Sequence, residues 1–386
     1  MTATIGAASA RAGAVTDPIR VMIVDDSVVV RGLVTRWVDE DRDLAVVSAH
    51  RNGRLAVDDI GRSDPDVVIL DIEMPELDGL AALPQMLKKK PNLVVIMAST
   101  LTRRNAEISM RALSLGAADY VPKPETNSGV TTSAEFRRDL IDKIKHLGAR
   151  VKSRPLPFAR PVRPQPAAAA ARPSAVPAAA KPTFTTRPYS RVAPRVLLIG
   201  SSTGGPQALA EIFQHIGPAM GRMPVLVTQH MPPTFTAILA EHISKTAARP
   251  CAEGEDGEPV IAGRIYVARG GKHMLVEKSA SGPIIRLSDA PPVNFCKPAV
   301  DPFFKSAVDI YGSAILAVVL TGMGSDGADG AGLISAAGGS VIAQDEESSV
   351  VWGMPGATAK SGVCSDVLPL LQIGPKIARI IGGARP

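Results

Sequence analysis

Short runs of apolar, mostly β-branched residues alternate along the chain with longer segments in which apolar residues recur at helical spacing. This alternation predicts α/β domains built on parallel sheets. The predicted buried strands are 19–26, 67–70 and 93–99 in the first part, and 195–200, 224–230, 264–268, 314–322 and 340–344 in the second. A β-hairpin is expected as well, with strands at 273–277 and 284–288.

The two parts are separated by a segment whose composition suits neither helices nor strands. Residues 151–194 contain ten prolines, eleven alanines, eight Lys or Arg and no Asp or Glu. Proline lacks a backbone N–H and has a fixed φ, so this density predicts an extended, semi-rigid linker. We therefore expect a disordered tail at 1–18, a first domain at 19–135, a helix end and linker at 136–194, and a second domain at 195–386.

The net charge suggests an anionic partner until it is mapped along the chain. The protein has 386 residues, with 43 Lys and Arg against 37 Asp and Glu, and a formal charge of +6. The eight cations of the linker exceed this excess, because the rest of the chain has 35 basic and 37 acidic residues. The predicted domains are therefore not basic. Because only 4% of residues are aromatic, base stacking is not expected either, and we predict no nucleic-acid partner.

The other compositional features favour a cytoplasmic protein. No stretch approaches the roughly 18–20 apolar residues of a transmembrane helix. The N-terminal segment lacks the cationic and leucine-rich regions of a secretory signal. The three cysteines are far apart and form no CxxC motif, which argues against a disulfide framework and against a zinc site. We expect a cytoplasmic monomer without direct membrane insertion.

Acidic residues follow the predicted strands of the first part. Asp25 and Asp26 close the first strand, and Asp71 closes a later one. The carboxyl ends of parallel strands share one sheet edge, where three carboxylates would repel one another unless a cation such as Mg²⁺ neutralised them. Ser99 ends the next strand and Lys123 follows later, and a hydroxyl and an ammonium would suit a phosphoryl group on Asp71. A simpler alternative for a single strand-end residue is helix capping, for example by Asp26.

With this ordered set of residues, 19–125 resembles a response-regulator receiver domain, and the segment DIEMPELDGL is close to the phosphoacceptor segment of that family. The resemblance implies a flavodoxin-like, five-stranded parallel sheet. It also implies that Asp71 accepts a phosphoryl group from a histidine kinase while Asp25 and Asp26 help to hold Mg²⁺. Ser99 and Lys123 would then respond to the phosphate.

A possible nucleophile follows the first strand of the second part. Gly200, Ser202 and Gly204 fit G-x-S-x-G, a sharp turn that exposes a serine hydroxyl, although glycine-rich turns at this place bind phosphate about as often. His230 and Asp326 each follow a later strand, and an imidazole held by a carboxylate is the base that serine needs.

Other residues compete for these roles. The alternative bases are His215 and His242, which lie in predicted helices, and His273, which opens a hairpin strand. Asp326 or Asp329 could instead bind a cation in its Gly/Asp loop, but the loop lacks EF-hand spacing. The chain order Ser–His–Asp also differs from that of α/β-hydrolases and of the serine proteases, which argues against an ordinary lipase.

Considered together, the motifs IGSSTGGP, QHMPPTFT, EDGEPVIAGRIYVARGGKHM, LTGMGSDGADG and VWGMPGA resemble those of the chemotaxis protein-glutamate methylesterase/glutaminase (CheB) family, and the match spans about 19–380. The resemblance implies a doubly wound, mostly parallel catalytic domain. It implies hydrolysis of glutamyl methyl esters and deamidation of glutamines on methyl-accepting chemoreceptors, in chemotaxis or a related chemosensory pathway.

The same resemblance implies roles for individual residues. Ser202 would be the nucleophile, His230 the base and Asp326 its orienting partner, while the Met323 backbone N–H would serve the oxyanion hole, with no cofactor for the esterase reaction. Two alternatives remain. One is a receiver-controlled serine hydrolase acting on another acyl substrate. The other is a DNA-binding response regulator, which would need a basic reading element that the second part does not show.

Overall fold

The computed structural model describes residues 17–123, 130–153 and 184–383. The first 16 residues of the expected tail, and residues 154–183 of the expected linker, lie outside the described residues. Within the described ranges, no helix combines the length and the apolar character needed to cross a membrane.

In the described part of the first half, five strands form a sheet in the order β2-β1-β3-β4-β5, with all neighbours parallel. The strands are β1 Ile19–Val24, β2 Leu44–His50, β3 Val67–Asp71, β4 Val94–Ser99 and β5 Asp119–Pro122. The helices are α1 Val28–Asp39, α2 Gly53–Ser63, α3 Gly79–Lys89, α4 Arg103–Ser114 and α5 Val130–Ser153. This is the flavodoxin-like order, so the expected fold is confirmed.

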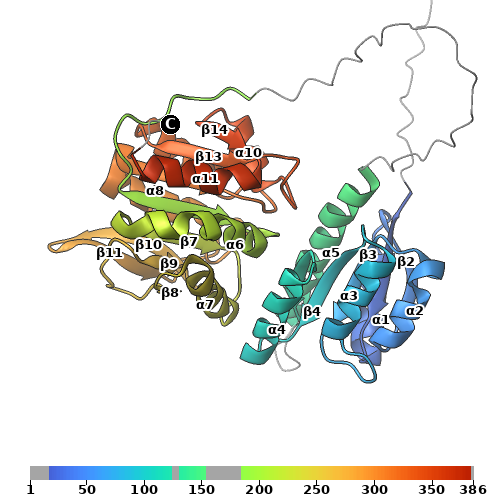
Figure 1. The fold of residues 1–386 in the computed structure, drawn as a ribbon. Helices are drawn as coiled ribbons and strands as arrows, with labels where there is room; N and C mark the ends of the chain where they lie inside the picture. Colours follow the sequence, from blue (N-terminus) through green and yellow to red (C-terminus); the bar gives the residue numbers. More distant parts are fainter. Residues whose placement is uncertain (1–16, 124–129, 154–183, 384–386) are drawn as a thin grey trace, which may run out of the picture.

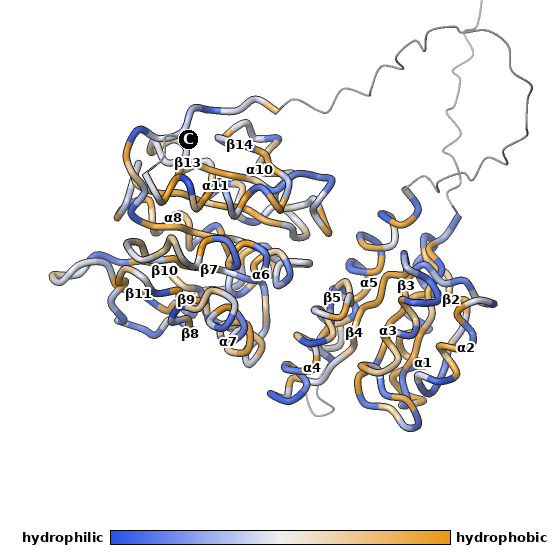
Figure 2. Tube along the Cα trace, in the orientation of Figure 1, coloured by the Kyte–Doolittle hydropathy of each residue, from blue (hydrophilic) through white to orange (hydrophobic). Residues whose placement is uncertain are grey.

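Helices cover both faces of this sheet. Helices α1 and α5 pack on one face, where Trp37 and Leu140 contact the cluster around Ile69. Helices α2, α3 and α4 pack on the other, where Leu83 and Met110 join a second cluster. Figure 2 shows hydrophobic colour concentrated along the central strands, as expected for a parallel sheet that is buried on both faces.

Local sequence explains where several of these helices begin. A side-chain oxygen at the N-cap accepts a hydrogen bond from the backbone N–H three residues later, which satisfies one of the unpaired N–H groups of the first turn. The capping residues are Ser27 for α1, Asn52 for α2, Asp78 for α3 and Thr102 for α4.

The described part of the second half contains a seven-stranded sheet in the order β14-β13-β12-β6-β7-β9-β8, again with all neighbours parallel. The strands are β6 Val196–Ser201, β7 Val225–Gln229, β8 Cys251–Glu253, β9 Ile265–Val267, β12 Ile315–Val319, β13 Ser340–Gln344 and β14 Asp366–Leu368. The separate hairpin consists of β10 His273–Ser279 and β11 Gly282–Ser288. The expected parallel fold with a hairpin is confirmed.

The helices of this half also lie on both faces of its sheet. They are α6 Gly205–Ile216, α7 Phe235–Ala247, α8 Val300–Tyr311, α9 Ala328–Ala336, α10 Met354–Lys360 and α11 Leu370–Ile381, with 3₁₀ turns at Gly217–Arg222 and Gly312–Ala314. Helices α6, α7 and α11 share one hydrophobic cluster, and α8, α9, α10 and the hairpin share the other. Strand β6 lies between β7 and β12, so the order in which the chain adds strands to the sheet changes side at β6. In open parallel sheets such a switch point opens a crevice at the carboxyl ends of the strands.

The structure contains strands that the hydrophobic pattern did not predict. These are β2, β5, β8 and β14. Strands β8 and β14 have three residues each and β5 has four, too few for a periodic signal. Strand β2 lies at the sheet edge and is only partly buried, so its residues are not uniformly apolar.

The last part of the expected linker packs onto the second half. The Phe184 ring lies 5.6 Å from that of Trp352. The Tyr189 hydroxyl donates a hydrogen bond to Asp366 at 2.6 Å, and Arg187 N donates to a backbone carbonyl at 2.8 Å. Residues 184–194 therefore contribute to the packing of the C-terminal unit, although their composition continues that of the linker.

The α4–β5–α5 side of the first half faces α6 and α7 of the second (Figure 1). The Tyr120 ring stacks on Phe235 of α7, with centroids 4.5 Å apart and planes 7° apart. At the rim, Arg103 of α4 forms an ion pair with Glu241 of α7 at 2.6 Å. Tyr120 and Phe235 belong to one hydrophobic cluster that continues across the boundary, so the two halves bury apolar surface against each other.

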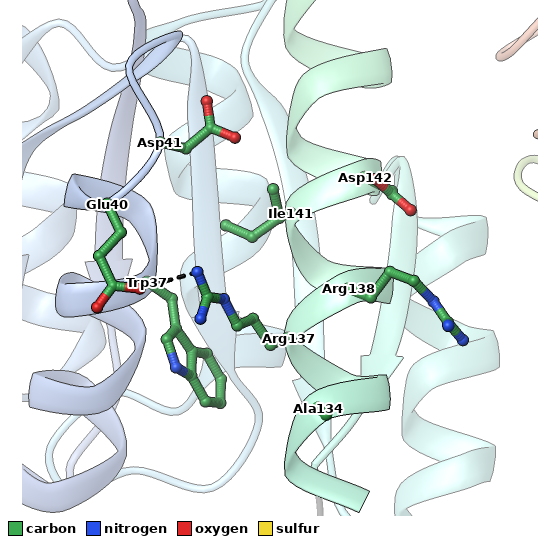
Figure 3. Close-up of a pocket in the computed structure, with 8 residues that line it drawn as sticks. All are labelled: Trp37, Glu40, Asp41, Ala134, Arg137, Arg138, Ile141 and Asp142. Atoms are coloured by element: carbon green, nitrogen blue, oxygen red, sulfur yellow. Dashed lines mark ion pairs between the residues drawn. The ribbon is translucent and has the colours of Figure 1, made fainter. Parts of the chain in front are cut away.

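A second contact between the halves involves α5. Figure 3 shows Arg137 turned toward Glu40, with which it forms a 2.8 Å ion pair, whereas the Arg138 side chain points away from that ion pair. The Arg138 guanidinium carbon lies 4.1 Å from the ring centroid of Phe295, in the loop before α8 of the second half. A cation over an aromatic face is attracted by the ring quadrupole, so this pair links α5 to that loop.

Candidate active site and phosphorylation site

Three carboxylates meet at the carboxyl edge of the first sheet. Asp25 and Asp26 follow β1 and Asp71 ends β3, and one oxygen from each lies within 4.8 Å of the others. Asp25 and Asp71 are buried, whereas Asp26 is exposed. The strand-end positions predicted from the sequence therefore place these three residues together.

Lys123 partly neutralises the cluster. Its Nζ lies 2.7 Å from a carboxylate oxygen of Asp25 and 2.7 Å from one of Asp71. Burial raises the pKa of Asp71 to about 6, with a further contribution from the negative charge of Asp25, even though Lys123 opposes the shift. Burial alone would lower the pKa of Lys123, but Asp71 and Asp25 raise it above its ordinary value, so the ammonium remains charged.

Ser99 lies at the same edge but makes other contacts. Its backbone carbonyl accepts a 2.6 Å hydrogen bond from Lys123 N. Its buried hydroxyl donates to the carbonyl of Thr100 at 3.1 Å. The structure thus places Ser99 beside Lys123, with its hydroxyl bonded to backbone.

The capping alternative for Asp26 is wrong. Ser27 caps α1, accepting a hydrogen bond from Val30 N, and Asp25 Oδ1 accepts one from Ser27 N at 2.9 Å. Asp26 thus remains exposed and available as a ligand. The donor set consists entirely of carboxylate oxygens around one ammonium, which fits a hard cation such as Mg²⁺.

In the second half, Ser202 follows β6 on a turn that requires glycine. Gly204 has a φ of 75°, and a Cβ on Gly205 would lie 2.0 Å from Oε1 of Gln229. Ser202 N donates to the carbonyl of Thr321 at 3.0 Å, and Gln229 Nε2 donates to the Ser202 carbonyl at 2.9 Å. These bonds hold the backbone of Ser202 between β7 and the turn after β12.

His230 and Asp326 are in direct contact. His230 Nε2 lies 2.7 Å from Asp326 Oδ2, and the two side chains are 10% and 2% exposed. Asp326 also accepts hydrogen bonds from the backbone N–H groups of Val300 at 2.6 Å and Asp301 at 2.9 Å. Burial alone would raise the pKa of Asp326, but the bond from His230 and these two N–H groups hold it below its ordinary value. Asp326 is therefore a fixed carboxylate.

The surroundings of His230 favour its cationic form. Burial alone would lower its pKa, but Cys296 and Asp326 beside the ring raise that pKa to about 10. Because Nε2 faces Asp326, Nδ1 is the ring nitrogen left to take a proton from a hydroxyl. Among the described residues, the Ser202 hydroxyl makes no hydrogen bond to His230, and such bonds often form only when substrate is bound.

The turn after β12 contacts the turn that carries Ser202. A Cβ on Gly322 would lie 2.8 Å from that of Ser202, so only glycine allows this approach. Within the described ranges, the N–H of Met323 carries no hydrogen bond. Val351 of the second half joins the hydrophobic cluster of α1, α5 and their sheet face, and the Met323 side chain and Val350 pack against that shared cluster.

The alternative residues are placed elsewhere. His215 lies on α6 beside Glu211, and His242 lies on α7. The ring nitrogens of His273 are bonded to backbone, Nδ1 to Ala299 N and Nε2 to a carbonyl. Asp329 lies in the first turn of α9. Of the two acidic residues considered, Asp326 and Asp329, the structure places only Asp326 in contact with His230.

Sequence reasoning missed two residues of the site. Gln229 accepts a hydrogen bond from Ser201 Oγ at 2.6 Å and donates to Ser202, and its position directly before His230 was the available signal. Cys296, which is half-buried in a loop 66 residues further along the chain, raises the pKa of His230. No periodicity or motif considered above pointed to Cys296.

Comparisons with known families match both halves of the chain. Residues 21–135 match the family described as response regulator receiver domain. Residues 197–377 match the family described as CheB methylesterase. The first match spans the five-stranded sheet and ends within α5, and the second spans the seven-stranded sheet and ends within α11.

Similar proteins extend over nearly the whole chain. A protein-glutamate methylesterase/protein-glutamine glutaminase of group 2 operon from Bradyrhizobium diazoefficiens is 58% identical over 95% of this chain and 95% of its own length. One of the same description from Rhodopseudomonas palustris is 58% identical over 100% of both chains. The crystal structure of the Thermotoga maritima CheB methylesterase catalytic domain is 39% identical, covering 49% of this chain and 100% of that one, with a TM-score of 0.47.

Proposed function

This chain belongs to the CheB methylesterase family, and we propose that Ser202, His230 and Asp326 perform the chemistry of that family. It is a receiver-linked hydrolase of chemotaxis that removes methyl groups from glutamyl methyl esters and deamidates glutamines. The buried 2.7 Å contact between His230 and Asp326, at the switch point beside Ser202, is the observation that supports the proposed residues best.

The first step is attack by Ser202 Oγ on the ester carbonyl. His230 takes the hydroxyl proton, the new C–O bond forms, and the carbonyl oxygen becomes an oxyanion near the free N–H of Met323. Asp326 stabilises the resulting imidazolium. The intermediate then collapses: the bond to the methoxy oxygen breaks, His230 returns the proton, and methanol leaves.

Water completes the reaction. His230 removes a proton from water, the hydroxide attacks the acyl–Ser202 ester, and the serine oxygen leaves with the proton that His230 returns. The product is a free glutamate carboxylate. A glutamine amide passes through the same tetrahedral intermediate with ammonia as the leaving group. No step requires a cofactor.

The base must be neutral to act, whereas its pKa of about 10 keeps it mostly protonated at neutral pH in the structure described. Val351 joins the hydrophobic cluster of the first half, and Arg138 lies over Phe295 in the loop before α8. The receiver thus contacts Val351, whose carbonyl accepts a 3.0 Å hydrogen bond from Gly322 N of the proposed oxyanion turn, and Phe295 in the loop before α8.

The receiver would release these contacts when Asp71 is phosphorylated. An oxygen of Asp71 attacks the phosphorus of a phosphohistidine on a histidine kinase, and the P–N bond breaks. Asp25, Asp26 and Asp71 would hold Mg²⁺, which supplies positive charge against the phosphoryl group when bound. Lys123, already 2.7 Å from Asp71, then pairs with phosphate, and β5 connects Lys123 to Tyr120 at the interface.

The substrate is a chemoreceptor signalling region, consistent with the names of the similar proteins. The low aromatic content of the chain, 4%, suits a shallow groove for a polar helix surface. We also propose that the protein acts as a monomer in the cytoplasm, with the cationic linker connecting its two halves.

Methanol release from methylated receptor membranes tests the catalytic residues. Ser202→Ala should abolish release, whereas Ser281→Ala, at the exposed hairpin turn, should retain it. Release that is undiminished in Ser202→Ala would rule out the proposed nucleophile. Release from a soluble ester but not from receptor membranes would point to a different acyl substrate.

Phosphodonor stimulation tests the regulation. Asp71→Ala in the full chain should lose stimulation but keep basal release. A fragment of residues 184–386 retains the packing of Phe184 and Tyr189 and should be active without a phosphodonor. If that fragment is silent while the intact chain works, simple covering of the site by the receiver is wrong.

A further inference from the structure

The residue directly before the proposed oxyanion turn contacts the turn of the nucleophile at three successive positions. The carbonyl of Thr321 accepts the 3.0 Å hydrogen bond from Ser202 N, and Thr321 Oγ1 donates to the carbonyl of Thr203 at 2.9 Å. A Cβ on Gly204 would lie 3.2 Å from the methyl carbon of Thr321, so these two residues are closely packed. Thr321 is only 1% exposed, and it holds this turn from beneath.

The hydroxyl of Thr321 is used both as a donor and as an acceptor. Besides donating to Thr203, it accepts a hydrogen bond from Val351 N at 2.9 Å. A hydroxyl has one proton to donate, and the bond to the Thr203 carbonyl is shorter than the 3.2 Å approach to the Val351 carbonyl. The hydroxyl therefore joins the turn of the nucleophile to the segment that contains Val351.

That segment is tied to the oxyanion turn by further bonds. Gln344 Oε1 accepts a hydrogen bond from Thr321 N at 2.9 Å, and Gln344 Nε2 donates to the carbonyl of Ser348 at 2.9 Å. The carbonyl of Val351 accepts a hydrogen bond from Gly322 N at 3.0 Å. Thr321 is thus fixed through its own N–H, its hydroxyl and the residue that follows it.

These contacts determine a distance that the reaction depends on. An oxyanion donor stabilises the tetrahedral intermediate only when it lies about 3 Å from the oxyanion, so the turn of Ser202 and the N–H of Met323 must keep a fixed separation. We propose that Thr321 is a positioning residue for the esterase reaction, and that its hydroxyl sets this separation. The inference rests on the proposed roles of Ser202 and Met323.

The substitution Thr321→Val tests the hydroxyl by itself. Valine has nearly the shape of threonine, so the packing against Gly204 is kept, whereas the Thr203 carbonyl and Val351 N lose their shared partner. The two turns can then shift apart. A misplacement of about 1 Å can cost about a hundredfold in rate, so we expect Thr321→Val to lower kcat by about ten- to a hundredfold.

Three readouts separate positioning from a general loss of structure. KM for receptor membranes should change by less than about twofold, because Thr321 is buried beneath the turns and does not face a bound receptor. Thr321→Ser keeps the hydroxyl and should hold kcat within about threefold of the wild-type value. The pH dependence of kcat should keep its midpoint in Thr321→Val, because the substitution changes no charge near His230.

The experiment measures methanol release by the full-length chain over a range of concentrations of methylated receptor membranes, which gives kcat and KM separately. The matched control is Thr358→Val. Thr358 is equally buried, and its hydroxyl donates to the carbonyl of Met354 within α10 at 2.9 Å. The same loss of a buried hydroxyl should there leave kcat within about twofold of wild type.

Unchanged kcat in Thr321→Val would overturn the proposal, and so would an equal loss in Thr321→Ser or a loss carried by KM alone. If circular dichroism shows that Thr321→Val does not fold, Gln344→Met decides: it removes the acceptor of Thr321 N, and unchanged kcat would count against the positioning role.

The same measurements keep this proposal apart from the proposed function. If the wild type releases no methanol, or if Ser202→Ala still releases it, the proposed function fails. A wild-type enzyme that depends on Ser202, together with a Thr321→Val variant of normal kcat, refutes only the positioning role of Thr321.

Discussion

Replacing Asp71 by Asn should stabilise the first half of the protein when no divalent cation is bound. Asp71 is only 6% exposed, and Asp25 shares its Lys123 partner at 2.7 Å. The ionised carboxylate is thus held in a buried position beside a second negative charge. Asparagine keeps the shape and removes the charge.

The magnitude follows from the pKa of Asp71, which rises from 3.8 to about 6 on folding. About two pH units at about 1.4 kcal/mol per unit correspond to a cost of about 3 kcal/mol for the ionised form. The folded state binds this proton more tightly than the unfolded state. The contribution of Asp71 to stability is therefore most favourable below pH 3.8, becomes less favourable as the pH rises to about 6, and carries the full cost above that value. Lys123 stays charged throughout, because its pKa is raised.

The assay is urea unfolding followed by the fluorescence of Trp37, in a Trp352→Phe background and with a chelator present. Trp37 is buried against Phe136 in the first half, so it reports on that half. At pH 7, Asp71→Asn should raise the free energy of unfolding by up to about 3 kcal/mol, and the gain should vanish near pH 4.

The control is Asp58→Asn, a mostly exposed carboxylate in α2, which should change stability by about 0.5 kcal/mol or less. Added Mg²⁺ should narrow the difference between Asp71→Asn and the wild type, because the metal stabilises only the intact carboxylate set. A gain that is independent of pH, or a loss of stability at pH 7, would refute the inference that ionised Asp71 is destabilising.

Three further changes have distinct expected results. Gly322→Ala places a Cβ 2.8 Å from that of Ser202 and should lower methanol release by about a hundredfold. The circular dichroism spectrum should stay unchanged, and normal methanol release would contradict the close approach of the two turns. Arg138→Ala removes the cation over Phe295 and should raise unphosphorylated activity about two- to fivefold, whereas no change would show that this contact does not restrain the enzyme. Chelation of divalent cations should prevent labelling of Asp71 by a small phosphodonor, and persistent labelling would contradict the proposed magnesium site.

Much of the fold was predictable from the hydrophobic pattern. The apolar runs correspond to β1, β3, β4, β6, β7, β9, β12 and β13, with differences only at their ends. Such strands are buried on both faces, so their residues are almost uniformly apolar and easily recognised. The short strands β5, β8 and β14 depend on pairing with neighbours that are distant in sequence, and their own residues carry too little signal.

The candidate site was partly predictable for the same reason. Ser202, His230 and Asp326 each follow a strand, and parallel strands end at one edge. The sequence by itself did not determine that β6 lies between β7 and β12, which is what brings the three residues to one crevice. It also did not show that Ser27, and not Asp26, caps α1, because both are good capping residues.

The sequence by itself determined the long buried strands, the residues at their ends and the family resemblance, because each of these is recorded in a short contiguous segment. Only the tertiary structure decided that Cys296 raises the pKa of His230, that Val351 joins the hydrophobic cluster of the first half, and that Tyr120 stacks on Phe235. These contacts join segments that are far apart in the chain and meet in irregular loops or across the interface. Their positions follow from the packing of whole layers, which no local pattern of apolar and polar residues encodes.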